Sequence, residues 1–210
     1  MTNEEFKNAL IERHGRDIYE KLINSRVAIA GLGCLGSNVA ISLARAGIGK
    51  LFLVDHDTVD ITNLNRQQYF TEDIGKKKTE ALSDIIKKIN PVIKLETADT
   101  YVTEENALSL FKDYPIVCEC FDKAENKAML INTLLGQSDN ITVVSASGMA
   151  GYGSSNTITT SHPMERLYLC GDKISGIEQG MGLMAPRVAL CAMHQANTVL
   201  EIILENKGDK

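Results

Sequence analysis

The sequence predicts an α/β fold with a mostly parallel sheet, helices on both faces and antiparallel strands added at one edge. Three observations lead to this prediction. Short apolar runs alternate with helical segments along most of the chain. A glycine-rich turn joins the first apolar run to the first long helix. A second glycine-rich turn, "GMAGYG", leads into a Thr-rich run, "NTITT", which suggests the antiparallel addition.

The composition is that of an ordinary soluble domain, with 210 residues, 44% hydrophobic and 23% charged. The net charge of −5 argues against nucleic acid as the main partner, because phosphate backbones attract concentrated Lys and Arg. No apolar run approaches the roughly 20 residues that cross a bilayer. The N-terminus, "MTNEEFKNAL", is polar and acidic, unlike a signal peptide. We therefore expect a single cytoplasmic domain without membrane contact.

The first half of the chain gives five elements. The run "RVAIA" is short, apolar and ended by glycine, as a buried strand is. Proline stops the last helix of this half, because proline cannot continue a helix. In order, we expect a helical segment over about 1–24, a strand over 26–30, a helix over 35–46, a strand over 50–55 and a helix over 76–89.

The second half continues the alternation and then loses it. Residues 161–182 lack clear periodicity and contain several glycines, so we expect a long crossover-type loop there. Pro186 is well placed to open the last helix, over about 185–205. Between residue 90 and this loop we expect a strand over 92–99, a helix over 104–111, a strand over 115–120, a helix over 123–135, a strand over 141–147 and the Thr-rich strand over 156–160.

The glycine-rich turn has the spacing of a dinucleotide-binding motif, with Gly31, Gly33 and Gly36 between a predicted strand and a predicted helix. Glycine allows the tight turn and a close approach to phosphate, and the helix N-terminus offers N–H donors to an anion. Asp55 ends the second strand, where an acid accepts hydrogen bonds from ribose. These features predict a Rossmann-like nucleotide site without identifying the nucleotide.

A polar stretch, "DHDTVDITNLNRQ", follows the second strand and contains more than ribose binding requires. Arg66 offers a planar fork of donors for phosphate oxygens, and Asn63 can donate without adding charge. Lys78 lies near the start of the next helix. Asp122 follows a strand at the edge where such sheets bind ligands, and its carboxylate is the kind of ligand that Mg²⁺ prefers. A triphosphate would explain both cations.

Four segments resemble the ThiF/MoeB/HesA family, the bacterial relatives of ubiquitin-activating enzymes. They are "GLGCLGSN", "GIGKLFLVDHDTVDITNLNRQ", "GKKK" and "FDKAENK", and the resemblance runs in order from about Arg13 to Ile203. The segment "GLMAPRVALCAMHQAN" is most similar to the short ThiF-type proteins of thiamine biosynthesis. The resemblance implies an adenylyltransferase that forms a homodimer, and it implies that residues 1–210 form one ATP-binding adenylation domain. It would use ATP and Mg²⁺ to activate the C-terminal glycine carboxylate of a small ubiquitin-like sulfur carrier.

The resemblance also assigns roles by motif. Asp55 matches the ribose-binding acid, Lys78 the lysine that neutralises the triphosphate, and Asp122 the magnesium-linked acid. Arg16 resembles an N-terminal arginine that reaches into a partner subunit's ATP site. The catalytic residues implied are Arg66, Lys78 and Asp122, and the nucleotide-binding residues are Gly31, Gly33, Gly36, Asp55, Asp57, Asn63, Arg66, Lys78 and Arg16.

The cysteines depart from the family pattern. Many members carry two Cys-x-x-Cys pairs that bind zinc, but this chain has no such pair, so we expect no structural zinc and reduced thiols. The loop that carries a covalent cysteine in some ThiF proteins has none here, and Cys170 is merely nearby. Cys191 and His194 lie one helical turn apart, a spacing open to metal binding but more typical of packing.

Other interpretations remain open at this point. A nicotinamide-dependent oxidoreductase would explain the glycine turn and Asp55, but not Arg66 or Lys78. A non-catalytic protein could bind a ubiquitin-like tail, and a relative could activate tRNA instead of a protein. Locally, Lys78 could belong to a solvated lysine run, and Asp122 could cap the following helix, since Asp is a preferred N-cap.

Overall fold

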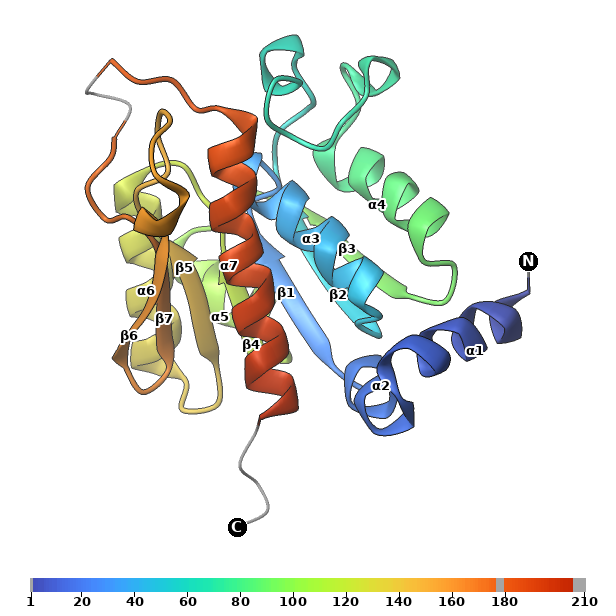
Figure 1. Cartoon of the computed structure of the whole chain (residues 1–210). Coiled ribbons are helices and arrows are strands. Elements are labelled where there is room, and N and C mark those ends of the chain that lie inside the picture. The colour runs from blue at the N-terminus through green and yellow to red at the C-terminus, as the bar shows by residue number, and fades with distance from the viewer. Residues whose placement is uncertain (1, 177–179, 206–210) are drawn as a thin grey trace.

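The computed structural model describes residues 2–176 and 180–205. One seven-stranded sheet runs through it in the order β3-β2-β1-β4-β5-β7-β6 (Figure 1). Every neighbouring pair is parallel except β6 with β7. The strands are β1 (Arg26–Ala30), β2 (Lys50–Asp55), β3 (Lys94–Asp99), β4 (Ile116–Glu119), β5 (Thr142–Ala146), β6 (Thr159–Met164) and β7 (Leu167–Gly171).

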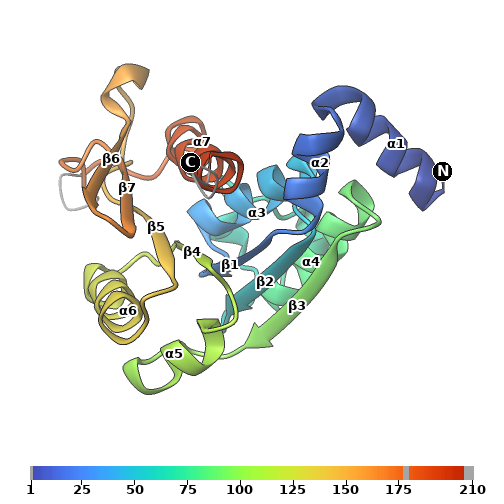
Figure 2. The same ribbon diagram turned by 90° about the horizontal axis from the view of Figure 1, so that it is seen from below.

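The helices divide between the two faces of this sheet. Alternate side chains of β1 enter different cores, Val27 and Ile29 on one side and Ala28 and Ala30 on the other. The first core also takes side chains of α3, α4 and α7, and the second those of α5 and α6 (Figure 2). The helices are α1 (Asn3–His14), α2 (Arg16–Ile23), α3 (Cys34–Ala46), α4 (Lys78–Ile89), α5 (Glu104–Phe111), α6 (Ala124–Gln137) and α7 (Ala185–Leu204).

The predicted fold class is confirmed, including the antiparallel strand at one edge. The N-terminal helical segment is two helices, because the backbone of Gly15 adopts φ +83° between them. None of the residues of α1 is buried. The Thr-rich strand starts later than expected, since residues 155–157 form a 3₁₀ turn and β6 begins at Thr159.

The prediction of a long loop over 161–182 is wrong for the first half of that range. Residues 167–171 form β7, which inserts between β5 and β6 and is parallel to β5. The prediction failed because β6 is exposed at nearly every position, so its sequence shows no alternation. The irregular segment begins at Asp172, and the expected loop residues 177–179 lie outside the described part of the chain.

Gly36 fixes how closely α3 approaches the first turn. A Cβ at Gly36 would lie 1.8 Å from the carbonyl oxygen of Gly31, which is backbone and cannot rotate away. Gly136 is also helical, but a Cβ there would meet nothing within 4 Å. We expect Gly36→Ala to lower the free energy of unfolding by about 3 kcal/mol, as overpacking does. Gly136→Ala should instead raise it by up to about 1 kcal/mol, since Ala is the better helix former.

Urea unfolding, monitored by circular dichroism, measures the change in the free energy of unfolding for both variants. The Gly136→Ala variant controls for the generic effect of adding a methyl group to a helix. Equal unfolding midpoints for the two variants would show that the α3–turn contact is not as tight as the structure has it.

Candidate functional site

A cavity of about 310 Å³ opens where β1, β2, β3 and β4 end. This carboxyl edge is where open α/β sheets bind ligands. Of the residues predicted to bind the nucleotide or catalyse the reaction, two do not line it: Gly36, which packs under the turn, and Arg16. The predicted residues that do line it are Gly31, Gly33, Asp55, Asp57, Asn63, Arg66, Lys78 and Asp122.

The glycine turn forms the floor of this cavity. Gly31 has φ +89°, and a Cβ there would lie 3.0 Å from the carbonyl oxygen of Cys120, the residue that follows β4. At Gly33 a Cβ would meet only Gln67 Nε2, at 3.8 Å, so the space above this residue is open. Gly33 is the N-cap of α3 and provides no side-chain cap, which leaves the first N–H groups of the helix available to an anion.

Asp55 ties the glycine turn to the end of β2. Its Oδ2 accepts a hydrogen bond of 2.5 Å from the N–H of Leu32, and its Oδ1 accepts one of 2.8 Å from the N–H of Asp57. The side chain is buried. A carboxylate has about four acceptor sites, so Asp55 retains capacity for hydroxyl donors. The structure thus gives Asp55 a structural role that the sequence did not predict, and ribose binding stays a prediction.

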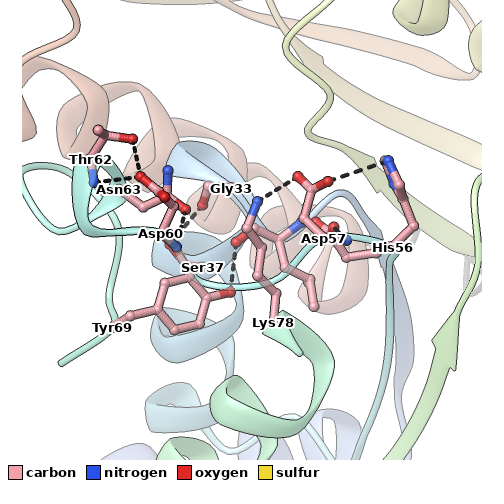
Figure 3. Close-up of polar contacts among 11 residues, drawn as sticks. Gly33, Ser37, His56, Asp57, Asp60, Thr62, Asn63, Tyr69 and Lys78 are labelled. Atoms are coloured by element: carbon pink, nitrogen blue, oxygen red, sulfur yellow. Dashed lines mark hydrogen bonds and ion pairs between the residues drawn. The ribbon is translucent and has the colours of Figure 1, made fainter. Parts of the chain in front are cut away.

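Lys78 points into the cavity and pairs with Asp57. The two charged atoms, Nζ and Oδ2, lie 2.7 Å apart, and His56 contacts the other oxygen of Asp57 at 3.3 Å (Figure 3). Burial raises the pKa of Asp57, but the hydrogen bond and charge of Lys78 lower it more, so the pKa lies below the usual 3.8. Lys76 and Lys77 are different, since they pair with Asp73 and Asp99 and are about half exposed. The solvated-face interpretation therefore does not apply to Lys78.

Arg66 and Asn63 leave donors unused beside the cavity. The Arg66 Nη1 donates to the carbonyl of Thr62 at 2.8 Å and to Asn65, while its Nε is buried without a partner. Asn63 uses Oδ1 to accept from the N–H of Asp60 at 3.1 Å (Figure 3). Among the described residues its Nδ2 has no acceptor. A buried donor is normally satisfied, so the Arg66 Nε favours an oxygen-rich ligand.

Asp122 stands between the first cavity and a second one. The second has a volume of about 480 Å³ and shares Asp122, Cys34, Phe121 and Leu183 with the first. The expectation that Asp122 could cap α6 is wrong, because the N-cap is Lys123, which makes no side-chain cap. Asp122 is exposed. Within residues 2–176 and 180–205 it has no recorded hydrogen bond or ion pair, which leaves its carboxylate free for a ligand.

A second group of possible metal ligands lies nearby. In the described part of the chain, Asp55, His56 and Asp57 form the single cluster of three such residues, with their ligand atoms within 4.8 Å of one another. The carboxylate of Asp55 already accepts hydrogen bonds from two backbone N–H groups, and the carboxylate of Asp57 is paired with Lys78. Oxygen ligands suit Mg²⁺. The unpaired carboxylate of Asp122 therefore fits a magnesium ion better than this cluster does.

The second cavity has a polar wall that the sequence did not indicate. Glu119 lies in the strand expected over 115–120 and is fully buried, yet its carboxylate accepts from Lys127 Nζ at 3.1 Å and from Ser145 Oγ at 2.5 Å. The N–H of Phe121 donates to it as well, at 2.7 Å. Lys127 reaches the second cavity and is only slightly exposed. The quoted family segments contain Lys127 alone of the three side chains, and the network was not predicted because its members lie on three separate elements.

Arg16 lies far from the cavity within its own chain. It begins α2, which leads into the amino end of β1 (Figure 1). The cavity lies instead at the carboxyl ends of the strands. The side chain is exposed. A role for Arg16 in the same chain is therefore not supported by this arrangement, and a role in a partner's site stays a prediction.

The cysteines of this region are packed rather than activated. Cys170 ends β7, is buried, and has a pKa raised by burial above the usual 9.0. Burial raises the pKa of Cys191 to about 12. His194 does not join Cys191 in a ligand group, since its Nδ1 lies 3.0 Å from Thr160 Oγ1. These contacts support the packing interpretation of Cys191 and His194.

The fold and the site together define a Rossmann-like domain with a polar ligand cavity at the carboxyl edge of its sheet. The chain belongs to the ThiF family, whose model matches residues 6–210. This confirms the resemblance seen in the sequence. None of the described helices combines the length and the apolar character needed to span a membrane.

Curated relatives and solved structures agree with this assignment. The chain is 33% identical over 217 residues to the adenylyltransferase and sulfurtransferase MOCS3 of Dictyostelium discoideum, with 94% of this chain and 49% of the relative covered. It is 32% identical to UBA4 of Candida albicans, with 87% and 43% covered. The chain thus spans less than half the length of these two relatives.

The fold is similar to that of the Escherichia coli tRNA N6-threonylcarbamoyladenosine dehydratase TcdA. A structure of TcdA with AMP gives a TM-score of 0.86 at 21% identity, covering 96% of this chain and 95% of that one. A second structure of TcdA, in complex with ATP, gives a TM-score of 0.85.

Proposed function

We propose that this chain binds ATP and transfers its adenylyl group to the C-terminal glycine carboxylate of a small ubiquitin-like carrier, with release of pyrophosphate. One observation carries the proposal. A single cavity gathers the glycine turn, Asp55, the unpartnered donor of Arg66 and the inward ammonium of Lys78, with Asp122 at the boundary with a second cavity. An acidic strand end followed by two inward cations matches a ribose next to a polyphosphate.

The reaction needs charge stabilisation more than a protein base. A carboxylate oxygen of the carrier attacks the α-phosphorus while the bond from that phosphorus to the bridging oxygen breaks, and pyrophosphate takes the electron pair. The carboxylate is already ionised, so no proton has to be removed. Lys78, Arg66 and the N-terminus of α3 lie where they can hold the phosphates and stabilise the growing negative charge.

Magnesium fits the free carboxylate of Asp122, and when bound the ion neutralises phosphate charge. The carboxylates of Asp122 and Asp57 supply the oxygen ligands that such an ion prefers. The Asp57 carboxylate becomes available to the ion only when Lys78 turns to a phosphate. We therefore propose that nucleotide binding breaks the Lys78–Asp57 pair, so that Lys78 contacts a phosphate and Asp57 contacts the ion.

The second cavity is suited to the carrier tail. Gly176 lines it, which lets an extended Gly-Gly segment pass close to the backbone there, and Lys127, which pairs with Glu119, lies in the same wall. Because it shares Asp122 with the first cavity, a tail lying there would end beside the α-phosphate.

The identity of the carrier is a further part of the proposal. The names of the curated relatives combine adenylyl transfer with sulfur transfer, which supports a sulfur carrier but does not single out thiamine biosynthesis. We keep a thiamine-type carrier as the proposal, acting in the cytoplasm. We also propose a homodimer in which Arg16 of one subunit reaches the ATP site of the other.

A second candidate is adenylation of a carboxylate attached to tRNA. The specific observation is that TcdA, named for a tRNA modification, matches this fold over 95% of its own length, whereas the adenylyltransferase and sulfurtransferase relatives are about twice as long as this chain. The net charge of −5 weighs against this candidate. Membership of the ThiF family and the unpartnered cationic donor of Arg66 argue against the nicotinamide-dependent alternative.

Exchange of labelled pyrophosphate into ATP tests the proposal and separates the candidates. We expect exchange to require a carrier ending in Gly-Gly and to stop when that carrier ends in a glycine amide, because the amide cannot attack as a carboxylate. Exchange driven by modified tRNA instead would select the second candidate. Stabilisation by NAD but not by MgATP in a thermal shift experiment, or MgATP and carrier binding without any exchange, would overturn adenylyl transfer.

A further inference from the structure

Two irregular segments form one wall of the second cavity and meet at Asp172, the residue that follows β7. One segment is residues 147–150, which follow β5, and the other is residues 172–176. The cavity-lining residues that these segments share out are Ser147, Gly148, Met149, Ala150, Ser175 and Gly176. In the described structure neither segment belongs to a helix or a strand, so the shape of this wall depends on contacts between the segments.

Asp172 joins the two segments. Its Oδ1 accepts hydrogen bonds from the N–H groups of Ile174, at 2.9 Å, and of Ser175, at 2.8 Å. Its own N–H donates to the carbonyl of Gly148 at 3.0 Å, and the N–H of Ala150 donates to Ser175 Oγ at 3.0 Å. A Cβ at Gly148 would lie 2.1 Å from Asp172 Oδ1. The carboxylate is therefore packed directly against the backbone of the cavity wall.

Arg187 holds Asp172 in this position from the first turn of α7. Its Nη2 donates to Asp172 Oδ2 at 2.6 Å, and the two side chains are only 9% and 10% exposed. The same guanidinium donates to the carbonyl of Ser154 at 3.3 Å and to Thr157 Oγ1 at 3.0 Å. Removing one partner of a buried ion pair leaves the other charge uncompensated and is strongly destabilising. The position of Asp172 therefore depends on Arg187.

The Arg187–Asp172 pair is ionised at neutral pH. Burial raises the pKa of Asp172, but hydrogen bonds from Ser175, Ile174 and Arg187 lower it more, so the pKa lies well below the usual 3.8. Neither member of the pair is among the described residues that line the first or the second cavity. The pair can therefore act on a ligand only through the wall that it supports.

We propose that Arg187, acting through Asp172, is a positioning residue that holds the wall of the second cavity in the form that accepts the carrier tail. This inference rests on the proposed function, because it takes that cavity to bind the tail. The hydrogen-bond partners of the pair are Gly148, Ser154, Thr157, Ile174 and Ser175, none of which lines the first cavity in the described structure. The pair should therefore control binding of the carrier and not binding of ATP.

ATP–pyrophosphate exchange with a ubiquitin-like sulfur carrier ending in Gly-Gly tests this separation. Arg187→Gln should raise the carrier concentration for half-maximal exchange by about tenfold and change the KM for ATP by less than about twofold, since a displacement of about 1 Å at a binding site can cost up to 10²-fold. Arg187→Lys keeps the charge without the planar fork, so it should retain part of the wild-type affinity for the carrier.

Arg166 provides a matched control. Its guanidinium also donates to several backbone carbonyls, and none of the residues that accept these bonds lines the second cavity in the described structure: Leu135, Ser138 and Ile141. Arg166→Gln should lower Tm, as Arg187→Gln does, but leave the carrier requirement unchanged. An equal rise in the carrier requirement of both variants, or a parallel rise in the KM for ATP, would overturn the inference.

Amide hydrogen exchange gives a second readout that needs no carrier. Arg187→Gln should speed amide exchange in residues 148–150 and 174–175, whereas Arg166→Gln should not, because only Arg187 supports these segments. If wild-type pyrophosphate exchange depends on the carrier and Arg187→Gln leaves the carrier requirement unchanged, the inference is overturned and the proposed function stands. If the wild-type protein shows no carrier-dependent pyrophosphate exchange, both fail.

Discussion

Lys78→Met is expected to reduce ATP–pyrophosphate exchange by about 10³-fold, at the upper end of the loss found when one charge-stabilising donor is removed. The ammonium of Lys78 is nearly buried at the cavity, where surrounding protein screens it less than water would. Its positive charge therefore contributes most in the transition state, where negative charge builds up on the departing pyrophosphate. Steady-state exchange at saturating carrier, with ATP varied, separates a loss in kcat from a loss in ATP binding.

The neighbouring lysine provides a matched control. Lys77 precedes Lys78 directly, but its Nζ pairs with Asp99 at 3.1 Å and its side chain is 42% exposed. Lys77→Met removes the same charge from the same segment, and it should change exchange less than about threefold, because surface pairs contribute little. A loss in Lys77→Met as large as that in Lys78→Met would show that the lysine run acts through bulk charge rather than through one inward side chain.

The pH of the measurement does not confuse this comparison. The pKa of Asp57 lies below 3.8 while Lys78 is its partner, so the carboxylate stays ionised at neutral pH. A lowered folded-state pKa adds stability above the unfolded value, and this stability is lost as pH falls through the folded one. In the wild-type protein the protonation of Asp57 therefore does not enter a measurement made at neutral pH.

The sequence predicted the buried half of the fold and missed part of its exposed edge. β1, β2, β4 and β5 are apolar runs packed on both faces, and their boundaries lay within about two residues of the prediction. β7 was missed although it contains a run of leucine, tyrosine and cysteine, because the polar residues before it and the glycines that end and follow it suggested a loop. The pairing of β7 with both β5 and β6 is a tertiary choice that no local pattern records.

The candidate site divides in the same way. Residues in one continuous motif, such as Asp55, Asn63 and Arg66, were predicted and do line one cavity. The contact between Tyr101 and Asn126 in the cavity wall was missed, because the two residues are 25 positions apart and meet only through the fold. The ion pair between Lys78 and Asp57 was missed as well. Each residue was assigned to the nucleotide site separately, and nothing in the sequence shows that the two charges neutralise one another.

Asp122→Asn is expected to reduce magnesium-dependent exchange by about 10²- to 10³-fold, because it removes the one charge in the cavity whose carboxylate is unpaired among the described residues. Asparagine has the same shape, so the α6 N-terminus should be preserved, and the N-cap there is Lys123 in any case. We also expect the magnesium concentration for half-maximal exchange to rise, since an amide is a weaker ligand than a carboxylate for this ion. Excess magnesium should then restore part of the activity.

Glu125→Gln is the control for the loss of a negative charge in this region. Glu125 is exposed and lines the second cavity but not the first. It should leave the magnesium dependence unchanged. An unaltered magnesium dependence in Asp122→Asn would move the metal role to Asp55, His56 and Asp57, whose ligand atoms already lie within 4.8 Å of one another. In that case Lys78 must release Asp57 before the ion binds.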